Sequence, residues 1–328
     1  MSQNPPPCDE HVFVANNADG ISTAAKALKS GTIVAFPTET VYGLGADAGN
    51  DEAVVRVFAA KDRPTFNPLI VHVPDTEAAR PLVKFTIAAE ELARQFWPGA
   101  LTIVLPRRAN AALSLSVSAG LDTVALRVPA HETAHALLTA ADCPVAAPSA
   151  NRSGAVSPTT AKHVAASLPG PEAGGPACIV DGGACPVGLE STVVDVTGAN
   201  PILLRPGGVT AEEIETVIGP LAAPGEGALR SPGMLARHYA PATPLRLNAS
   251  EAQPGEVLLG FGPNARSAER NLSRLGNLAE AAANLFAMLR ELDAENHTGI
   301  AVSRVPDYGL GRAINDRLRR AASSAAAF

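Results

Sequence analysis

The chain has 328 residues, of which 46% are hydrophobic and 18% charged, and its formal net charge is -6. This length predicts two domains, and the acidic balance argues against a protein that holds long nucleic acid by neutralising its phosphates. Aromatic residues are only 4% of the chain, so a surface that stacks single-stranded bases is not expected. Because no run is apolar for long enough to cross a membrane and the polar start lacks the features of a secretory signal, we expect a cytoplasmic protein without a membrane partner.

Short β-branched runs alternate with Ala-rich segments of helical periodicity from residue 21 to residue 218, and several helices open with Ser, Thr or Asp caps. This alternation predicts an α/β fold. The expected strands cover residues 32–36, 69–73, 101–105, 123–128, 145–147, 179–181 and 192–196, and the expected helices cover residues 21–29, 51–60, 88–95, 133–140, 159–167 and 211–218.

The composition changes at residues 219–244, which are rich in Gly and Pro and cannot continue a helix or a central strand. Beyond this linker, strands are expected at 256–261 and 299–302 and helices at 278–292 and 309–322, which is a Rossmann-like strand–helix–strand–helix unit. The expected organisation is a larger domain at 1–218, a linker at 219–244 and a small α/β domain at 245–328.

The segment FPTETVYGLGADA, residues 36–48, gathers hydroxyl groups and glycines after a strand. Thr38 and Thr40 can present side-chain oxygens, and Gly43 and Gly45 allow a backbone to approach a ligand closely. A tight turn with capping threonines explains the same residues equally well. A dinucleotide-binding turn is not favoured, because the glycines do not follow the strand directly and no acidic residue stands at the required distance.

The segment KDRPTFNPLIVHV, residues 61–73, places Lys61 and Arg63 two residues apart in a stretch bounded by proline. A guanidinium takes phosphate oxygens in pairs and an ammonium acts as a point charge, so the two cations suit a nucleotide. The alternative is that Lys61 closes the preceding helix against its dipole. Asn67 and His72 lead into and end the following strand.

A serine-rich loop, PSANRSGAVSPTTA at residues 148–161, places Ser149, Asn151 and Ser157 before a helix that opens near Thr159. Hydroxyls and backbone amides at a helix start form an anion pocket, although an ordinary capping loop has the same composition. The chain contains no GxxxxGK, so any bound ATP is held without a P-loop.

Three further elements stand at strand ends, where α/β sheets bind ligands: Arg127, the segment Glu190-Ser191-Thr192 and Arg205. A single such arginine is more often ion-paired, but the joint occurrence of cations and serine loops favours one shared site.

The sequence HETAH, residues 131–135, matches the HExxH signature of zinc proteases. Pro129 stands just before it, so both histidines fall on the first turn of a helix rather than inside a long one, and a third ligand is missing. The four cysteines form no CxxC pair, so we expect no metal centre built by the protein.

Seven motifs, in this order, resemble the YrdC-like threonylcarbamoyl-AMP synthase family: FPTETVYGLG, KDRPTFNPLIVHV, FWPGALTIVLP, TVALRVP, APSANRSGAVSPTTA, GLESTVVD and LRPGGV. The resemblance as a whole spans residues 21–218, and SPGMLARHYAP followed by a small α/β unit is similar to the longer, two-domain branch. The resemblance implies a twisted, open, mixed sheet whose positively charged concave face holds ATP and L-threonine, plus a smaller C-terminal Rossmann-like domain.

The resemblance implies an L-threonylcarbamoyladenylate synthase, which is a nucleotidyltransferase. Its substrates would be ATP, L-threonine and bicarbonate, with Mg²⁺ on the phosphates, and its products threonylcarbamoyl-AMP and pyrophosphate. Partner proteins would then transfer the threonylcarbamoyl group to adenosine 37 of tRNA, so any contact of this chain with tRNA is expected to be transient. The alternative is a non-catalytic RNA-binding or translation-accessory module, which the acidic charge disfavours.

The resemblance also implies roles for single residues. Lys61 and Arg63 would be the catalytic cations. The residues around threonine would be Thr40, His72, Arg127, Ala147 and Ser191, and those around ATP would be Arg63, Asn67, Thr123, Ser149, Asn151, Ser157 and Arg205. The Pro-stiffened linker peptide 231–241 carries Arg237, His238 and Tyr239, and we hypothesise that it covers the site as a lid and shields a labile carbamate from water.

Overall fold

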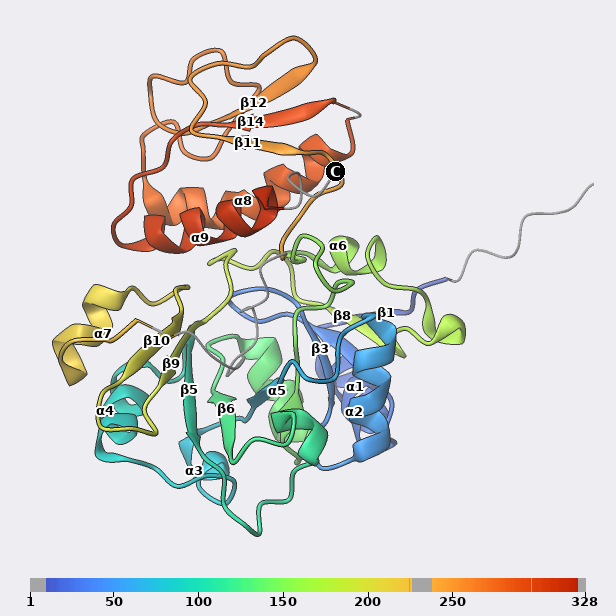
Figure 1. Cartoon of the computed structure of the whole chain (residues 1–328). Helices are drawn as coiled ribbons and strands as arrows, with labels where there is room; N and C mark the ends of the chain where they lie inside the picture. Colours follow the sequence, from blue (N-terminus) through green and yellow to red (C-terminus); the bar gives the residue numbers. More distant parts are fainter. Residues whose placement is uncertain (1–9, 224, 226–237, 296, 324–328) are drawn as a thin grey trace, which may run out of the picture.

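The computed structural model describes residues 10–223, 225, 238–295 and 297–323. A ten-stranded mixed sheet forms the larger domain, and a four-stranded parallel sheet forms the smaller, C-terminal one (Figure 1). The α/β fold with a second, smaller domain is therefore confirmed. The residue boundaries given above for the domains and linker stay a prediction.

The large sheet has the strand order β1-β8-β2-β3-β7-β4-β6-β5-β9-β10. Its strands are β1 (Phe13–Ala15), β2 (Val34–Phe36), β3 (Gly43–Asp47), β4 (Ile70–His72), β5 (Leu101–Pro106), β6 (Thr123–Arg127), β7 (Val145–Ala146), β8 (Cys178–Asp181), β9 (Thr192–Asp195) and β10 (Ile202–Arg205). Strand β4 runs parallel to β6 and β5 parallel to β9, whereas β6 pairs with β5, and β9 with β10, in antiparallel fashion. The carboxyl ends of β4, β6 and β10 and the starts of β5 and β9 therefore meet at one edge of the sheet.

Helices cover the two faces of this sheet unevenly. The helices of the larger domain are α1 (Ala18–Lys29), α2 (Asp51–Ala60), α3 (Thr76–Ala79), α4 (Ile87–Phe96), α5 (Glu132–Ala141), α6 (Ala161–Ala165) and α7 (Ala211–Ile218), with short 3-10 helices at Leu115–Ser118 and Pro171–Ala173. One face packs against α2, α4 and α7 through Val57, Leu92 and Ile214. On the other face, α1 and α5 cover the part around β2 and β8 through Leu28 and Leu137.

The remainder of that second face carries a small apolar cluster to which no helix of the described chain contributes. Its members are Ile70, Val104, Ala125, Val193 and Leu204, from β4, β5, β6, β9 and β10, with Ile202 packed beside them. The sheet face thus stays clear of helices next to the edge where the polar strand ends meet.

Local capping signals explain why two helices begin and end at the residues that the sequence predicts. The Asn50 side chain accepts the Ala53 N–H at the start of α2. At the start of α7, Thr210 and Glu213 form a reciprocal capping box, and Gly219 ends the helix. Such caps satisfy backbone groups that a helix end otherwise leaves unpaired.

The C-terminal domain contains strands β11 (Leu245–Leu247), β12 (Glu256–Gly260), β13 (Arg270–Asn271) and β14 (Gly299–Val302) in the order β11-β14-β12-β13, with helices α8 (Leu278–Asp293) and α9 (Leu310–Ala322). Both helices lie on the side of this sheet that faces the larger domain (Figure 1). Their core residues Leu285 and Ile314 belong to one cluster with Val41 and Leu189 of the larger domain. The two domains therefore share a continuous apolar interface.

The glycines of GLGADA lie in strand β3 rather than in a tight turn, and Gly43 but not Gly45 lines the pocket described below. A Cβ on Gly45 would stand 2.7 Å from the Phe36 ring and 2.8 Å from the Val145 side chain. Gly45 thus makes room for core packing and not for a ligand. The alternation of small residues in GLGAD gave no strand signal because β-branched and aromatic side chains are absent from it.

We predict that Gly45→Ala destabilises the protein by about 1–3 kcal/mol, the usual effect of overpacking a dense core. Gly198→Ala is the matched control, because a Cβ there meets nothing within 4 Å, and its effect should stay within about 0.5 kcal/mol. Urea denaturation followed by circular dichroism measures both. Equal stability of Gly45→Ala and the parent chain would contradict the packing described for β3.

Candidate active site

One pocket collects polar side chains from loops and strand ends that are far apart in the sequence. It is lined by Thr38, Thr40, Val41, Gly43, Arg63, Ile70, His72, Arg127, Ala147, Pro148, Ser149, Glu190, Ser191, Arg205, His238 and Tyr239. Three of these residues are arginines, and all three are less than 10% exposed. The pocket is therefore a buried, cation-rich hollow at the helix-free part of the sheet.

The strand register brings His72 and Arg127 together at one end of this pocket. These residues are direct partners in the parallel pair of β4 and β6. The backbone of Ala147, which follows β7, bonds to the Ile70 carbonyl at 2.9 Å, so the serine loop enters from the opposite end of β4. Thr40 completes this part through a hydroxyl contact of 2.8 Å with Thr38.

Arg127 is fixed by partners of two kinds. Its Nη2 lies 2.7 Å from a carboxylate oxygen of Glu39, and both side chains are less than 10% exposed. Its Nε donates to the Gly99 carbonyl at 3.2 Å. A buried arginine needs such compensation, and the Glu39 carboxylate occupies a position that a ligand carboxylate could take over.

His72 is an uncharged imidazole at the same end of the pocket. Burial, and next the positive charge of Arg127, lower the pKa of His72 to about 3. Its ring meets the Phe36 ring edge-on, with centroids 6.3 Å apart. The side chain therefore offers neutral nitrogen atoms to a ligand across the physiological pH range.

The other end of the pocket holds Arg63 and Arg205. Arg63 donates from Nε to the Asn67 carbonyl (3.3 Å) and from Nη2 to the Pro68 carbonyl (3.0 Å). Arg205 donates from Nε and Nη2 to the Ser191 carbonyl (3.1 and 2.9 Å). Burial lowers the pKa of Arg63 to about 10, which leaves it protonated at neutral pH. Backbone carbonyls thus orient both guanidiniums, and the charge of the Glu190 carboxylate also acts on Arg205.

Lys61 does not line the pocket. It is the C-cap of α2, and its Nζ donates to the backbone carbonyls of Ser149 and Asn151. Of the two interpretations of Lys61, the structure shows the helix cap directly. The phosphate-binding role is reflected only indirectly, because the ammonium reaches the serine-rich loop at residues 148–161. In this arrangement Lys61 positions the loop that carries Ser149.

Four more residues predicted around ATP lie behind the pocket wall or beside it. The buried Asn67 amide has no hydrogen-bond partner among the described residues. Asn151 donates to the Arg152 and Ala155 carbonyls at 2.9 Å, and Ser157 donates to Glu190. Thr123 begins β6 opposite Pro106, at the far end of the strand from Arg127.

The linker reaches the pocket through His238 and Tyr239, which are less than 10% exposed. The third predicted lid residue, Arg237, lies outside the described residues. Tyr239 has a left-handed backbone (φ 64°) and stacks on Phe286 of α8 with ring centroids 5.7 Å apart. The lid hypothesis itself stays a prediction.

Two carboxylates at this site were not predicted as site residues. Glu39 pairs with Arg127, and Glu190 pairs with Arg317 of α9 at 2.8 Å. Arg317 had no visible signal in the sequence, because it stands in NDRLRR among three other charged residues on an amphipathic helix. Only the docking of the C-terminal domain distinguishes it from its neighbours.

Buried polar atoms without a partner concentrate around this pocket. Among the described residues they include the Asn67 amide, His72 Nδ1, Asn151 Oδ1, His238 Nδ1 and the Tyr239 hydroxyl. Buried polar groups are normally hydrogen-bonded, so such a concentration is typical of a site that a polar ligand completes.

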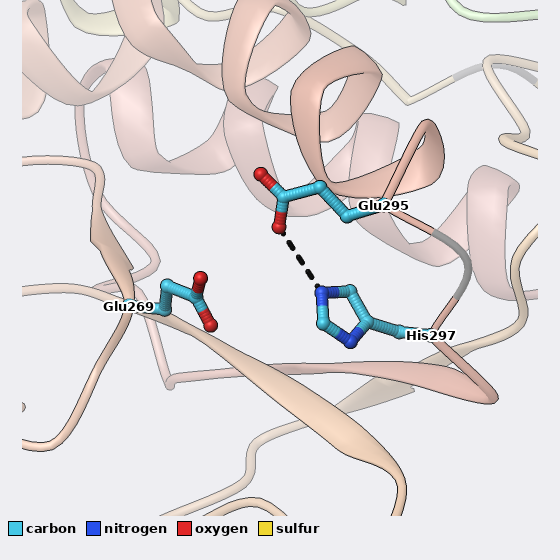
Figure 2. Close-up of side chains that lie close together, drawn as sticks. All are labelled: Glu269, Glu295 and His297. Carbon is cyan, nitrogen blue, oxygen red and sulfur yellow. Dashed lines mark hydrogen bonds and ion pairs between the residues drawn. The ribbon is translucent and has the colours of Figure 1, made fainter.

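Two metal-like patterns lie in the described part of the chain. His131 of the HETAH segment is the N-cap of α5, at the very start of the helix. Figure 2 shows Glu269, Glu295 and His297 of the C-terminal domain, whose ligand atoms lie within 4.8 Å of one another. Glu295 already bonds to His297 at 3.1 Å and to Arg270 at 3.1 Å, so its charge is compensated without an ion.

Residues 26–207 match the family described as "Telomere recombination" (Sua5/YciO/YrdC), and residues 209–323 match "Threonylcarbamoyl-AMP synthase, C-terminal domain". The chain therefore belongs to the Sua5/YciO/YrdC family. Within it, the chain has the two-domain form, since the second match covers the small parallel-sheet domain.

Relatives of the same length support this placement. The chain is 43% identical to the threonylcarbamoyl-AMP synthase of Bacillus subtilis over 333 residues, which covers 94% of each chain. It is 42% identical to that of Pyrococcus abyssi, covering 92% of this chain and 93% of that one. The crystal structure of P. abyssi Sua5 complexed with L-threonine superposes with a TM-score of 0.86 at 39% identity, covering 96% of this chain and 98% of that chain. In the described residues, no helix is long and apolar enough to span a bilayer.

We predict that the imidazole of His72 stays neutral from pH 8 down to pH 5. The unfolded chain takes up a proton at a normal histidine pKa of about 6.5 while the folded chain does not, so this residue makes stability fall as the pH drops below that value. NMR titration of labelled histidine, assigned with His72→Gln, measures the ring directly. A His72 midpoint between pH 6 and 7 would refute the buried, Arg127-facing position.

Proposed function

We propose that the protein is an L-threonylcarbamoyladenylate synthase, a nucleotidyltransferase that joins L-threonine, bicarbonate and ATP. The observation that carries this proposal is a single buried pocket lined by Arg63, Arg127 and Arg205 against one lining carboxylate, Glu190. Such an excess of preorganised positive charge suits an amino-acid carboxylate and a triphosphate bound side by side. The names of the full-length relatives and the threonine complex of P. abyssi Sua5 agree with it.

Threonine is assigned to the end with His72 and Arg127. Its carboxylate would replace or share the Glu39 contact of Arg127, which now spans 2.7 Å. Thr40, Ala147 and Ser191 would surround the remainder of the molecule. The amine nitrogen attacks the carbon of CO2 formed from bicarbonate, loses a proton and becomes a carbamate.

ATP is assigned to the end with Arg63, Ser149 and Arg205, with Asn67, Thr123, Asn151 and Ser157 around it. A carbamate oxygen attacks the α-phosphorus while the bond to the β-phosphate oxygen breaks, so pyrophosphate leaves with the electron pair and threonylcarbamoyl-AMP forms. Arg63 and Arg205 stabilise the charge that spreads over non-bridging oxygens. Holding both reactants side by side in one pocket supplies the remaining rate enhancement by proximity.

Mg²⁺ would arrive with the ATP phosphates, where it neutralises charge on their oxygens. Glu190, the carboxylate in the pocket wall, is already bonded to Ser157 and Arg317. The residues therefore fit an ion held mainly by phosphate oxygens and water rather than a protein-built metal centre.

A non-catalytic RNA-binding module is the competing function, and the geometry does not favour it. The arginines of the pocket are buried rather than spread over an exposed basic face. We therefore assign any role in tRNA modification to the adenylate product, which partner proteins would use to modify tRNA.

The assay that tests the proposed function is pyrophosphate release by the purified chain with ATP and Mg²⁺. Release should require both threonine and bicarbonate, and the product should carry the mass of threonylcarbamoyl-AMP. ATP turnover that ignores threonine, or RNA binding without any turnover, would contradict the proposal.

We predict that Arg63→Ala lowers turnover by roughly 10²-fold or more, as expected for loss of a preorganised contact to the reacting phosphate. Arg152→Ala is the matched control, since this arginine lies in the serine loop but is 63% exposed and pairs with Asp62. It should retain near-normal turnover. Wild-type rates for Arg63→Ala would remove Arg63 from the mechanism.

A further inference from the structure

One arginine of the C-terminal domain reaches the wall of the pocket. Arg317 lies in α9, and its side chain is only 1% exposed. Its Nε donates to Glu190 at 2.8 Å, its Nη1 donates to the Pro206 carbonyl at 2.9 Å, and its guanidinium carbon lies 4.9 Å from the centre of the Tyr239 ring. A single side chain from the second domain thus contacts three separate segments that build the pocket.

The contact between Arg317 and Glu190 controls the charge at the end of the pocket that is assigned to ATP. Burial opposes ionisation of this carboxyl, but the charges of Arg317 and then Arg205, together with the Ser157 hydroxyl, outweigh burial and keep the pKa of Glu190 below its usual value. If Arg317 were absent, a buried carboxylate would stand beside the bound phosphates and compete with them for the Arg205 guanidinium.

The hydrogen bond from Arg317 to the Pro206 carbonyl fixes the position of the backbone beside the pocket. Pro206 directly follows Arg205, the last residue of β10, so the bond from Arg317 fixes the backbone next to the side chain that faces the phosphates. Arg317 is itself held by Asp316, whose carboxylate lies 2.7 Å from Nη1 and also pairs with Arg320. The arginine is therefore oriented before any ligand arrives.

We propose that Arg317 is a positioning residue through which the C-terminal domain sets the affinity of the pocket for ATP. This inference rests on the proposed function, because it assigns the Arg205 end of the pocket to the triphosphate. Arg317 binds Glu190 and fixes Pro206, so Arg205 presents its charge to phosphate oxygens. His72 and Arg127 at the threonine end lie outside these contacts, whereas Ser191, also assigned to threonine, bonds to Arg205.

The test is the affinity for MgATP and for L-threonine, measured separately by calorimetry on the full chain. Arg317→Met should weaken ATP binding at least about tenfold, the scale of a lost charged hydrogen bond, and threonine binding by less than about threefold. Adding Glu190→Gln to Arg317→Met should recover most of the ATP affinity, because it removes the unpaired carboxylate. Arg317→Lys should keep part of it.

A pH series separates this role from a merely structural one. The charged groups around Glu190 are Arg317 and Asp316 of α9 and Arg205 of β10, with the Tyr239 hydroxyl beside them. Without Arg317, burial raises the pKa of Glu190, so low pH neutralises the carboxylate. Relative to wild type, Arg317→Met should therefore bind ATP better at pH 5.5 than at pH 8, and the double variant should lose this difference.

The matched control is Arg312→Gln, which removes another α9 arginine that contacts the larger domain, through an exposed ion pair with Glu212 of 3.5 Å. It should bind both ligands normally. Unchanged ATP affinity in Arg317→Met would overturn the inference, and so would an equal loss for ATP and threonine that Glu190→Gln does not restore. If the wild-type chain itself fails to bind ATP, the proposed function falls first.

Discussion

Compensation of buried positive charge is the constraint on which the pocket depends. Arg127 and Arg317 are paired with the carboxylates of Glu39 and Glu190. Arg205 bonds to Ser191 and interacts with the charge of Glu190, whereas Arg63 donates to backbone carbonyls. Carbonyls satisfy the hydrogen-bond geometry of Arg63 but leave its charge in a low-dielectric surrounding, which disfavours the folded protein. A triphosphate bound as proposed would remove this penalty. The same groups that weaken the empty protein therefore strengthen the complex, which is the usual compromise at functional sites.

The fold supplies this arrangement through strand direction and domain contact. Alternating parallel and antiparallel pairs bring the ends of β4, β6 and β10 and the start of β9 to one edge. The helix-free part of the sheet face lies next to that edge. One side of it is closed by the linker residue Tyr239, which stacks on Phe286 of α8, and by Arg317 of α9. The second domain is thus part of the site's structure and not only an appendage.

Much of the fold followed from local signals in the sequence. The α/β alternation, the bounds of α2 and α7, and the strands β12 and β14 and helices of the C-terminal unit could be predicted, because caps, periodicity and glycine stops act within a few residues. The short strands β11 and β13 were not predicted. Strand β3 could not be predicted either, since Gly45 is small on account of Phe36 and Val145, which are distant in sequence. Short edge strands such as β1 lack a buried face and give little pattern to detect.

The candidate site shows the same division. Motif residues such as Arg63 and Ser149 in loops and Arg205 at a strand end were visible in the sequence, and they line one pocket. Lys61, Asn151 and Ser157 come from the same motifs but do not line the pocket. Lys61 and Asn151 bond to backbone carbonyls of the serine-rich loop, and Ser157 bonds to Glu190. Spacing reveals which segments converge, but only packing decides which atoms face the ligand. Arg317 was invisible for the same reason.

The measurement that tests this account most directly is a crystal structure of the full chain with L-threonine and a non-hydrolysable ATP analogue. The account predicts phosphate oxygens within hydrogen-bond distance of Arg63 and Arg205, and the threonine carboxylate at Arg127 in the place of, or beside, Glu39. Phosphates bound elsewhere on the protein, with these arginines still bonded only to protein atoms, would contradict it.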